Sequence, residues 1–231
     1  MPARRASVRR APSVRRLREP RSPVPPAEVR LFEFSELESE TELESLAFYN
    51  SNLAGQDALS VTFAQCRFRA ADLSDCRLDQ LTMTDCLVTD SSWANLRADG
   101  GMMTRLRLTQ CRMTGVAWAD GLVRDVIVEA CRADLSAWRM TTFDAVTFVD
   151  CNLTSADFTN ADLRGVTFRN CDLTGAVFHH ASMDGTRFRG CTLAGVGDLS
   201  SWKGAVVHHT DLISLSYGLA QAAGIRIDDV D

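Results

Sequence analysis

Residues 151–178, written in groups of five, read CNLTS ADFTN ADLRG VTFRN CDLTG AVF. The third residue of every group is Leu or Phe, and apolar residues continue at steps of five from Leu53 to Leu193. A sequence period of this kind marks a repeat architecture and has to be interpreted before any other feature. We call these positions the centres, and the clearest of them are Leu53, Phe63, Phe68, Leu73, Leu153, Phe158, Leu163, Phe168, Leu173 and Phe178.

A second series of small or apolar residues lies two positions before the centres and includes all eight cysteines. Two inward side chains separated by one outward residue describe a short strand followed by a turn, because side chains alternate faces along a strand. A helix would instead need apolar residues three and four positions apart, and that spacing is absent from the repeats. The sequence therefore predicts about thirty short strand-turn units.

A unit of five residues cannot bury its own apolar side, so neighbouring units must stack. Residues 20 apart are of the same type in several columns, such as Cys111, Cys131, Cys151, Cys171 and Cys191. This predicts four units per coil, with residues 20 apart lying directly above one another. Coils spaced by about 4.8 Å give residues 47–196 about seven and a half turns and a filled rod about 35 Å long. The predicted fold class is an all-β solenoid.

Several units share a more specific pattern of residues. They are Ser51-Asn52-Leu53, Ala71-Asp72-Leu73, Cys151-Asn152-Leu153, Ala156-Asp157-Phe158, Ala161-Asp162-Leu163 and Cys171-Asp172-Leu173. This pattern resembles the A-(D/N)-L-x-x signature of the bacterial pentapeptide-repeat proteins. The resemblance implies a right-handed quadrilateral parallel β-helix. Some members of that family imitate duplex DNA, bind DNA gyrase and protect it from topoisomerase poisons. Several members dimerise through C-terminal helices.

The N-terminal segment differs in composition from the repeats. Residues 1–30 contain nine Arg, two Glu and all six Pro, and almost nothing apolar that could be buried. Such composition predicts a disordered tail. An Arg-rich arm for nucleic acid is the alternative function of this tail, and we disfavour it. Residues 31–46 follow as an acidic segment, for which a solvated charge run is the favoured interpretation. The alternatives are a short helix, a polar approach to the first repeat, or pairing with the basic tail of the same chain.

The C-terminal segment, residues 197–231, breaks the five-residue step at Asp198. Apolar residues then recur at helical spacing at Leu212, Leu215 and Leu219, which predicts a helix over about 211–223. An open β-rod exposes its last coil to pairing with other chains, so a cap is expected there. The helix either covers the last coil of its own chain or forms a homodimer interface with a second copy.

The sequence offers no recognisable catalytic, cofactor-binding or metal-binding motif. The eight Cys share one inward repeat phase, which favours reduced thiols that act as small buried fillers. The histidines form two adjacent pairs, His179–His180 and His208–His209, and neighbours on a strand face opposite ways. The sequence therefore predicts a protein that is not an enzyme and that needs no cofactor. The absence of a long apolar run disfavours a membrane segment and favours the cytoplasm.

The first functional hypothesis is a scaffold that binds an unknown protein partner through the outside of the rod. The second, from the family resemblance, is binding to DNA gyrase as a DNA mimic. A DNA mimic should be strongly acidic along one face, so the distribution of charge bears on the choice between these hypotheses. Residues 31–231 carry a net charge of −12, and residues 1–30 carry +7. The candidate acidic interaction face consists of Asp144, Asp150, Asp157, Asp162, Asp172 and Asp184.

Overall fold

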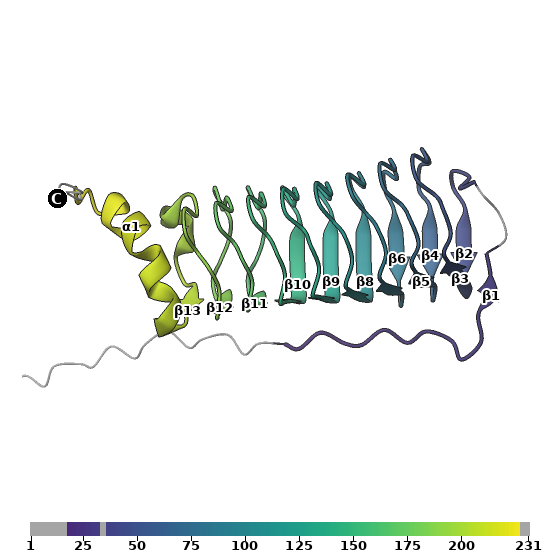
Figure 1. Ribbon diagram of the computed structural model, residues 1–231, viewed down its shortest axis with the longest axis horizontal. Coiled ribbons are helices and arrows are strands. Elements are labelled where there is room, and N and C mark those ends of the chain that lie inside the picture. Colours follow the sequence, from purple (N-terminus) through teal and green to yellow (C-terminus); the bar gives the residue numbers. More distant parts are fainter. Residues whose placement is uncertain (1–17, 33–35, 227–231) are drawn as a thin grey trace, which may run out of the picture.

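The computed structural model describes residues 18–32 and 36–226 of the 231-residue chain. The chain winds into a stack of parallel coils, which Figure 1 shows from the side. Its strands are β1 (Arg30–Leu31), β2 (Glu42–Glu44), β3 (Leu46–Tyr49), β4 (Thr62–Ala64), β5 (Arg67–Arg69), β6 (Thr82–Thr84), β7 (Leu87–Thr89), β8 (Met102–Thr109), β9 (Leu122–Glu129), β10 (Thr142–Val149), β11 (Thr167–Arg169), β12 (Arg187–Arg189) and β13 (Val206–Val207). The chain ends with two 3-10 turns, η1 (Leu199–Trp202) and η2 (His209–Asp211), and the helix α1 (Leu212–Ala222).

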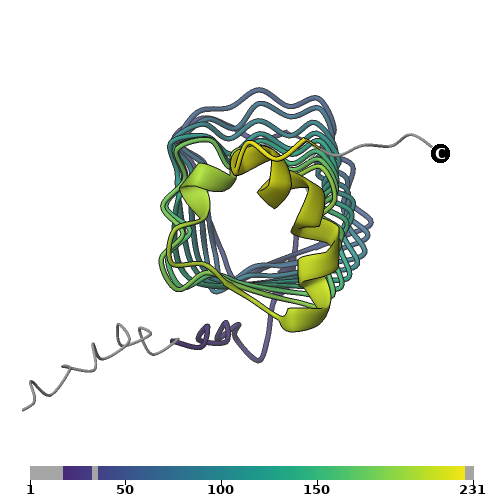
Figure 2. The same ribbon diagram turned by 90° about the vertical axis from the view of Figure 1, so that its left-hand side faces the viewer.

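Each regular coil is made of four of the five-residue units, as the sequence period predicts. The strands from β4 to β12 pair in parallel with the equivalent strand of the next coil, for example Phe148 with Phe168 and Phe168 with Phe188. The coils have a square outline in end view, in which α1 crosses one end (Figure 2). The fold is the predicted quadrilateral parallel β-helix.

We name the four sides of the square A to D in chain order. Side A contains β2, β4, β6 and the first halves of β8, β9 and β10. Side B contains β3, β5, β7, the second halves of β8, β9 and β10, and β11, β12 and β13. Sides C and D are joined by single bridges, such as Asn52 with Asp72 on side C and Asp57 with Arg77 on side D. The corner between sides A and B is crossed by the long strands β8, β9 and β10.

The interior of the rod is filled by the centres. The ten clearest centres are each at most 1% exposed. The rings of Phe148, Phe168 and Phe188 stack along the rod, with centroids 5.1 Å apart at both steps and interplanar angles of 8° and 5°. Buried apolar surface contributes about 25 cal/mol per Å², so this column is a main source of stability. The inside of the coil is a packed core.

The corners need an unusual backbone conformation. The residue two positions after a centre has a positive φ at nearly every corner, for example 54° at Asn170 and 80° at Gly165. Gly has no Cβ penalty there, and Asn and Asp tolerate this left-handed region better than other residues. This requirement explains the polar and glycine-rich last position of the repeats.

The coil extends further at both ends than the predicted range of 47–196. At the start, Glu42–Glu44 forms β2 and pairs with β4, because Leu43 continues the series of centres between two outward glutamates. At the end, β13 pairs with β12, with Val207 next to Phe188. This last coil is one residue shorter than the others, because the turn η1 replaces a regular strand-turn unit. On side B, the stack therefore continues in order from β3 to β13.

Of the predicted disordered tail, residues 1–30, residues 1–17 lie outside the described residues and residues 18–30 are described here. Residues 18–29 run along the outside of the rod, and β1 then pairs with β3. Figure 2 shows this segment outside the square outline. We call residues 18–31 the strap. No described helix is long and apolar enough to cross a membrane.

Candidate interaction surface

The cysteines are buried fillers inside the coil. All eight are free thiols, and each is buried. Their sulfurs lie near backbone carbonyls of the preceding coil, as in Cys76 Sγ to the Leu53 oxygen at 2.9 Å. Burial raises the pKa of the Cys76 thiol, which keeps it protonated and unreactive. The inward orientation predicted from the repeat phase is therefore confirmed.

The six aspartates of the predicted acidic face do not lie on one side. Asp144, Asp162 and Asp184 are on side A, whereas Asp157 is on side D and Asp172 on side C. Asp150 has the positive φ of a corner residue, between sides B and C. The sequence grouping is wrong because residues that are not separated by whole coils occupy different sides.

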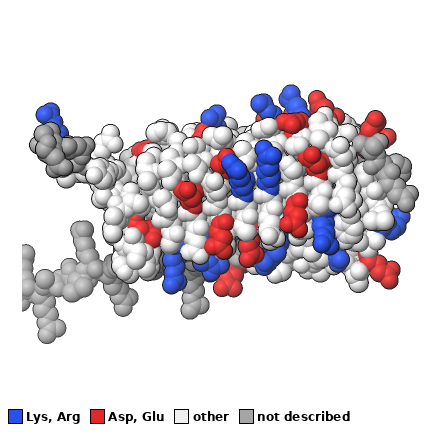
Figure 3. Space-filling view, viewed as in Figure 1, with Lys and Arg blue, Asp and Glu red and all other residues white. Residues whose placement is uncertain are grey.

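Arginines neutralise several of these carboxylates. Arg124 contacts Asp144 at 3.1 Å, Arg139 contacts Asp157 at 2.6 Å and Arg164 contacts Asp162 at 2.5 Å. Asp162 in turn raises the pKa of Arg164 by hydrogen bonding. Figure 3 shows acidic and basic residues interspersed on the side of the rod that faces the viewer. The outer surface is thus of mixed charge.

Side B differs because most of the charged residues at its outward positions are basic. They carry six arginines and one acidic residue, Glu129, which pairs with Arg107 at 3.0 Å. Within the described part of the chain, Arg169, Arg187 and Arg189 have no ion pair. Arg169 and Arg189 are direct neighbours in the register of β11 and β12. Like charges in this arrangement destabilise one another. Glu19 of the strap lines the same pocket as Arg169, beside Arg107 and Glu129.

The strap is anchored by a buried carboxylate at the corner between sides A and B. Asp125 is only 2% exposed. Its oxygens accept hydrogen bonds from Arg18 Nη2 at 2.5 and 2.6 Å and from the Arg21 backbone N–H at 3.1 Å. Arg18 Nη1 also reaches Asp144 at 3.3 Å. A charge-assisted pair at a shielded site is stronger than an exposed one. The guanidinium of Arg18 is consequently paired with two carboxylates of its own chain.

A second anchor lies two coils earlier on the same corner. The Val24 backbone N–H donates to Asp85 Oδ1 at 3.1 Å. Asp85 also forms two hydrogen bonds with Arg105, at 2.6 and 2.7 Å, and this interaction lowers the pKa of Asp85. Arg67 Nη2 donates to the Pro26 carbonyl at 2.9 Å. The strap is therefore held by side chains of the coil at regular intervals.

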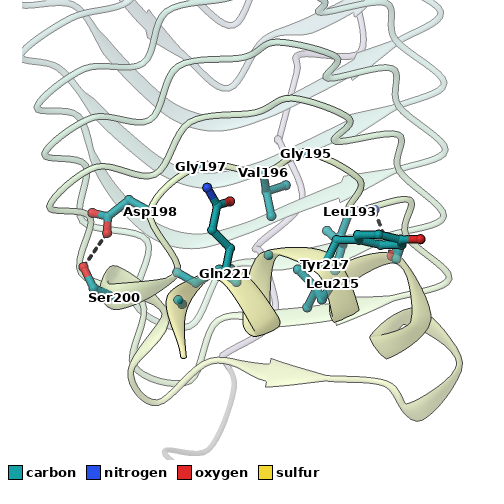
Figure 4. Close-up of a pocket in the computed structure, with 13 residues that line it drawn as sticks. Leu193, Gly195, Val196, Gly197, Asp198, Ser200, Leu215, Tyr217 and Gln221 are labelled. Carbon is teal, nitrogen blue, oxygen red and sulfur yellow. Dashed lines mark hydrogen bonds between the residues drawn. The ribbon is translucent and has the colours of Figure 1, made fainter. Parts of the chain in front are cut away.

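The C-terminal helix closes the last coil. Leu215 is buried, and it lines a cleft between α1 and the last coil together with Leu193 and Val196 (Figure 4). Backbone N–H groups that would bond to a following coil bond here to side chains. Cys191 N–H donates to Asp211 Oδ2 at 3.0 Å, and Leu193 N–H donates to Ser214 Oγ at 3.2 Å. This satisfies groups that would otherwise form an open sheet edge.

The outer face of α1 is apolar and exposed. Of the three leucines at helical spacing, only Leu215 is buried, whereas Leu212 is 46% and Leu219 is 48% exposed. The helix contacts the coil through Asp211, Leu215 and Gly218, which are four and three residues apart and lie on one face. Leu212 and Leu219 lie outside this face and are exposed to solvent. Ile213, at 80% exposure, extends the exposed apolar face. The helix thus has one face covered and another open.

Family comparison agrees with this geometry. A family model for the pentapeptide repeat region matches residues 102–178 and 127–199, which lie within the stacked coils. Residues 102–199 are therefore a pentapeptide repeat region. No curated protein sequence matches it.

Three solved structures are similar to this chain at low identity. A trypsin-treated variant of QnrB1, a plasmid-mediated fluoroquinolone resistance protein, is 16% identical, with 81% of this chain and 100% of that chain covered and a TM-score of 0.40. HetL, involved in heterocyst differentiation regulation in the cyanobacterium Nostoc, is 14% identical, with 76% and 92% covered and a TM-score of 0.28. Rfr23 from the cyanobacterium Cyanothece is 13% identical, with 72% and 88% covered and a TM-score of 0.19.

Sequence reasoning missed the residues that hold the strap and the cap. Asp85 and Asp125 look like ordinary corner residues, and Asp211 looks like part of a helix start. One signal for the strap was present, because Pro20, Pro23 and Pro26 recur at every third position. Three is the number of residues per turn of a polyproline II helix.

Proposed function

We propose that this protein is a non-catalytic scaffold that binds a protein partner on the outside of its coil. Support comes from the filled interior, because the centres of the described coils are packed apolar side chains. The polar side chains lie in ladders on the four outer sides, where a partner can contact several coils at once. A rod of stacked repeats offers an extended surface of this kind.

Side B is the side that we propose for the partner. The observation that carries this proposal is the group of Arg169, Arg187 and Arg189 on adjacent coils, which lacks ion pairs within the described residues. An acidic protein surface would relieve the repulsion between these neighbours and contribute to both rate and specificity of association. The partner is therefore expected to present carboxylates to the end of the rod nearer α1.

Quantitative affinity capture from a host extract tests this proposal. The baits are the full chain, the R189E variant, and R112E as a matched control, because Arg112 is an exposed arginine on side C. We expect R189E to lose an interacting protein at least tenfold and R112E to retain it. Equal retention by all three baits, or equal loss in both variants, would count against side B as the binding surface.

The alternative function is binding to DNA gyrase as a DNA mimic. Its support is the acidic balance of side A, whose outward positions carry Glu42, Glu44, Asp144, Asp162 and Asp184 against Arg124 and Arg164. The pairing of these arginines with Asp144 and Asp162 weakens the potential that a mimic of duplex DNA needs. Purified protein at micromolar concentration should alter gyrase supercoiling and quinolone-induced cleavage if this alternative holds. Unchanged activities would exclude it.

We also propose that the open face of α1 forms a homodimer interface. Leu212, Ile213, Tyr217 and Leu219 are between 46% and 80% exposed on this face. Exposed apolar groups of this size in one cluster are typical of protein contact sites. Pairing two helices would bury these groups and leave the long sides of both rods free for a partner.

A further inference from the structure

Three contacts in which the strap donates to the coil recur at every third position, and Arg67 donates in the opposite direction to the Pro26 carbonyl. Arg18 gives its guanidinium to Asp125, Arg21 gives its backbone N–H to Asp125, and Val24 gives its backbone N–H to Asp85. Pro20, Pro23 and Pro26 have the same spacing; Pro20 and Pro23 lie between these contact residues, and Pro26 follows the last of them. A three-residue period is the period of a polyproline II helix, whose backbone makes no internal hydrogen bonds.

The dimensions of the strap and the coil match. In a polyproline II helix, the step from Arg21 to Val24 advances by about 9.3 Å, at about 3.1 Å per residue. Their acceptors, Asp125 and Asp85, are two coils apart. Asp85 lies at the corner between β6 and β7, Asp125 lies within β9, and β8 belongs to the coil between them. Two coils span about 9.6 Å, at about 4.8 Å between neighbouring strands. For this step, one turn of the peptide corresponds to two coils of the rod. Arg18, one turn before Arg21, reaches the same Asp125 through its long side chain.

The corner also supplies the chemistry that such a segment needs. The hydrogen bonds described for the Asp125 carboxylate all come from the strap. Arg105, which lies one coil away, is hydrogen-bonded to Asp85, and Asp85 uses one oxygen for the strap N–H as well. Leaving a buried carboxylate such as Asp125 without a hydrogen-bonded partner is costly. With the strap in place Asp125 is buried, and the guanidinium of Arg18 gives the covered carboxylate its charged partner.

We infer that this corner is a docking groove for arginine-containing proline-rich segments of a partner protein in the polyproline II conformation. In the free chain its own residues 18–26 occupy the groove and act as a competitor. The strap defines the pattern that fits, with an arginine first and prolines two, five and eight positions later, as in Arg18-Glu19-Pro20-Arg21-Ser22-Pro23-Val24-Pro25-Pro26. The positions three and six after the arginine must not be proline, because their N–H groups donate to Asp125 and Asp85.

This inference rests on the proposal that the outside of the coil binds a protein, and it adds a second contact site to it. A tethered segment competes at an effective concentration that reaches the millimolar range for short linkers. A free peptide should therefore bind weakly to the wild-type chain. It should bind better once the strap has lost its arginine, because the tethered competitor is then weaker.

Fluorescence anisotropy with a labelled peptide of residues 16–28 tests the groove. The proteins are the full chain and its R18A, R18A/D125N and R18A/D150N variants. Asp150 is the matched control, since it is also a corner aspartate with positive φ but makes no strap contact among the described residues. Asn is suited to both positions because it tolerates positive φ. Circular dichroism verifies that each variant is folded.

The expected result is binding to R18A at least tenfold tighter than to the wild type. The R18A/D125N variant should bind the peptide at least tenfold more weakly than R18A, while R18A/D150N should bind it as tightly as R18A. A peptide with Ala at its three period-defining prolines should bind less tightly than the original. Equal affinities for R18A/D125N and R18A/D150N, or no binding to folded R18A, would overturn the inference.

Two further outcomes separate this inference from the alternatives. A concentration-dependent dimer of the wild type that disappears in R18A would show exchange of straps between two copies, and would overturn the assignment to a partner protein. The R189E capture experiment reports on a different part of side B. Loss of a captured protein in R189E together with failed peptide binding would sustain the scaffold proposal and reject the groove.

Discussion

Replacing Phe168 by alanine should strongly destabilise the rod. Phe168 is fully buried, and its ring stacks between Phe148 and Phe188 at 5.1 Å on both sides and meets Phe158 edge-on at 5.9 Å. A buried Phe→Ala change costs about 3–5 kcal/mol through lost transfer energy and the cavity left behind. Because two stacked contacts are lost at once, we expect the upper part of that range. Conversion to Leu keeps most of the volume but loses the same three ring contacts, so it should cost less than conversion to Ala while still destabilising the rod.

Urea unfolding followed by tryptophan fluorescence and far-UV circular dichroism measures these differences. In a stack of repeats each coil contacts only its neighbours, so the coils after Phe168 should unfold first in the alanine variant. Hydrogen exchange resolved along the chain would locate that loss. Thr167→Ala, at the outward neighbour in β11, is the control and should change the unfolding free energy by at most about 0.5 kcal/mol. A Phe168→Ala variant within about 1 kcal/mol of the wild type would refute the assignment of stability to the ring column.

Three further changes have defined outcomes. The hydrogen bonds with Arg105 lower the pKa of Asp85, so the ionised carboxylate stabilises the fold above the unfolded pKa of about 4. This stabilisation is lost as the pH falls through the pKa of the folded protein. The urea midpoint should therefore fall less between pH 5 and pH 2 in D85N than in the wild type, and parallel curves would contradict this. Gly121→Ala should cost about 1–3 kcal/mol, because a Cβ at this position would lie 2.6 Å from the Trp118 ring, and an unchanged melting temperature would refute that clash. Light scattering should give a dimer for the wild type and a monomer for Ile213→Glu, whereas a monomeric wild type would reject the α1 interface.

The coil could be predicted in detail because its sequence and its geometry have the same period. Each centre, such as Phe63 or Leu163, packs against the centres one coil away, so the pattern in the sequence is the pattern of contacts. The ends were less predictable, because β13 follows the irregular turn η1 rather than another five-residue unit. The acidic grouping failed for a reason that the sequence already contained. Position within the coil assigns Asp157 and Asp172 to different sides.

The strap could not be predicted from composition. Arg- and Pro-rich segments lack the apolar side chains that offset the entropy of ordering, and this argument led to a disordered tail. Order comes here from specific acceptors on the coil, above all the buried carboxylate of Asp125. That side chain is recognisable as a site only when the corner and the strap are seen together. The role of Asp211 as an acceptor for the last coil was hidden for the same reason.

The square coil also restricts how the length of this protein can change during evolution. A duplication or loss of one whole coil would add or remove one layer and leave every other residue on its own side. A change of a single five-residue unit would turn all later sides by a quarter of the square and carry Asp125 away from Arg18. Between Asp85 and Asp125 even a whole layer is forbidden, since Val24 and Arg21 span a fixed distance. Related chains that retain the strap are therefore expected to vary in length only outside this interval.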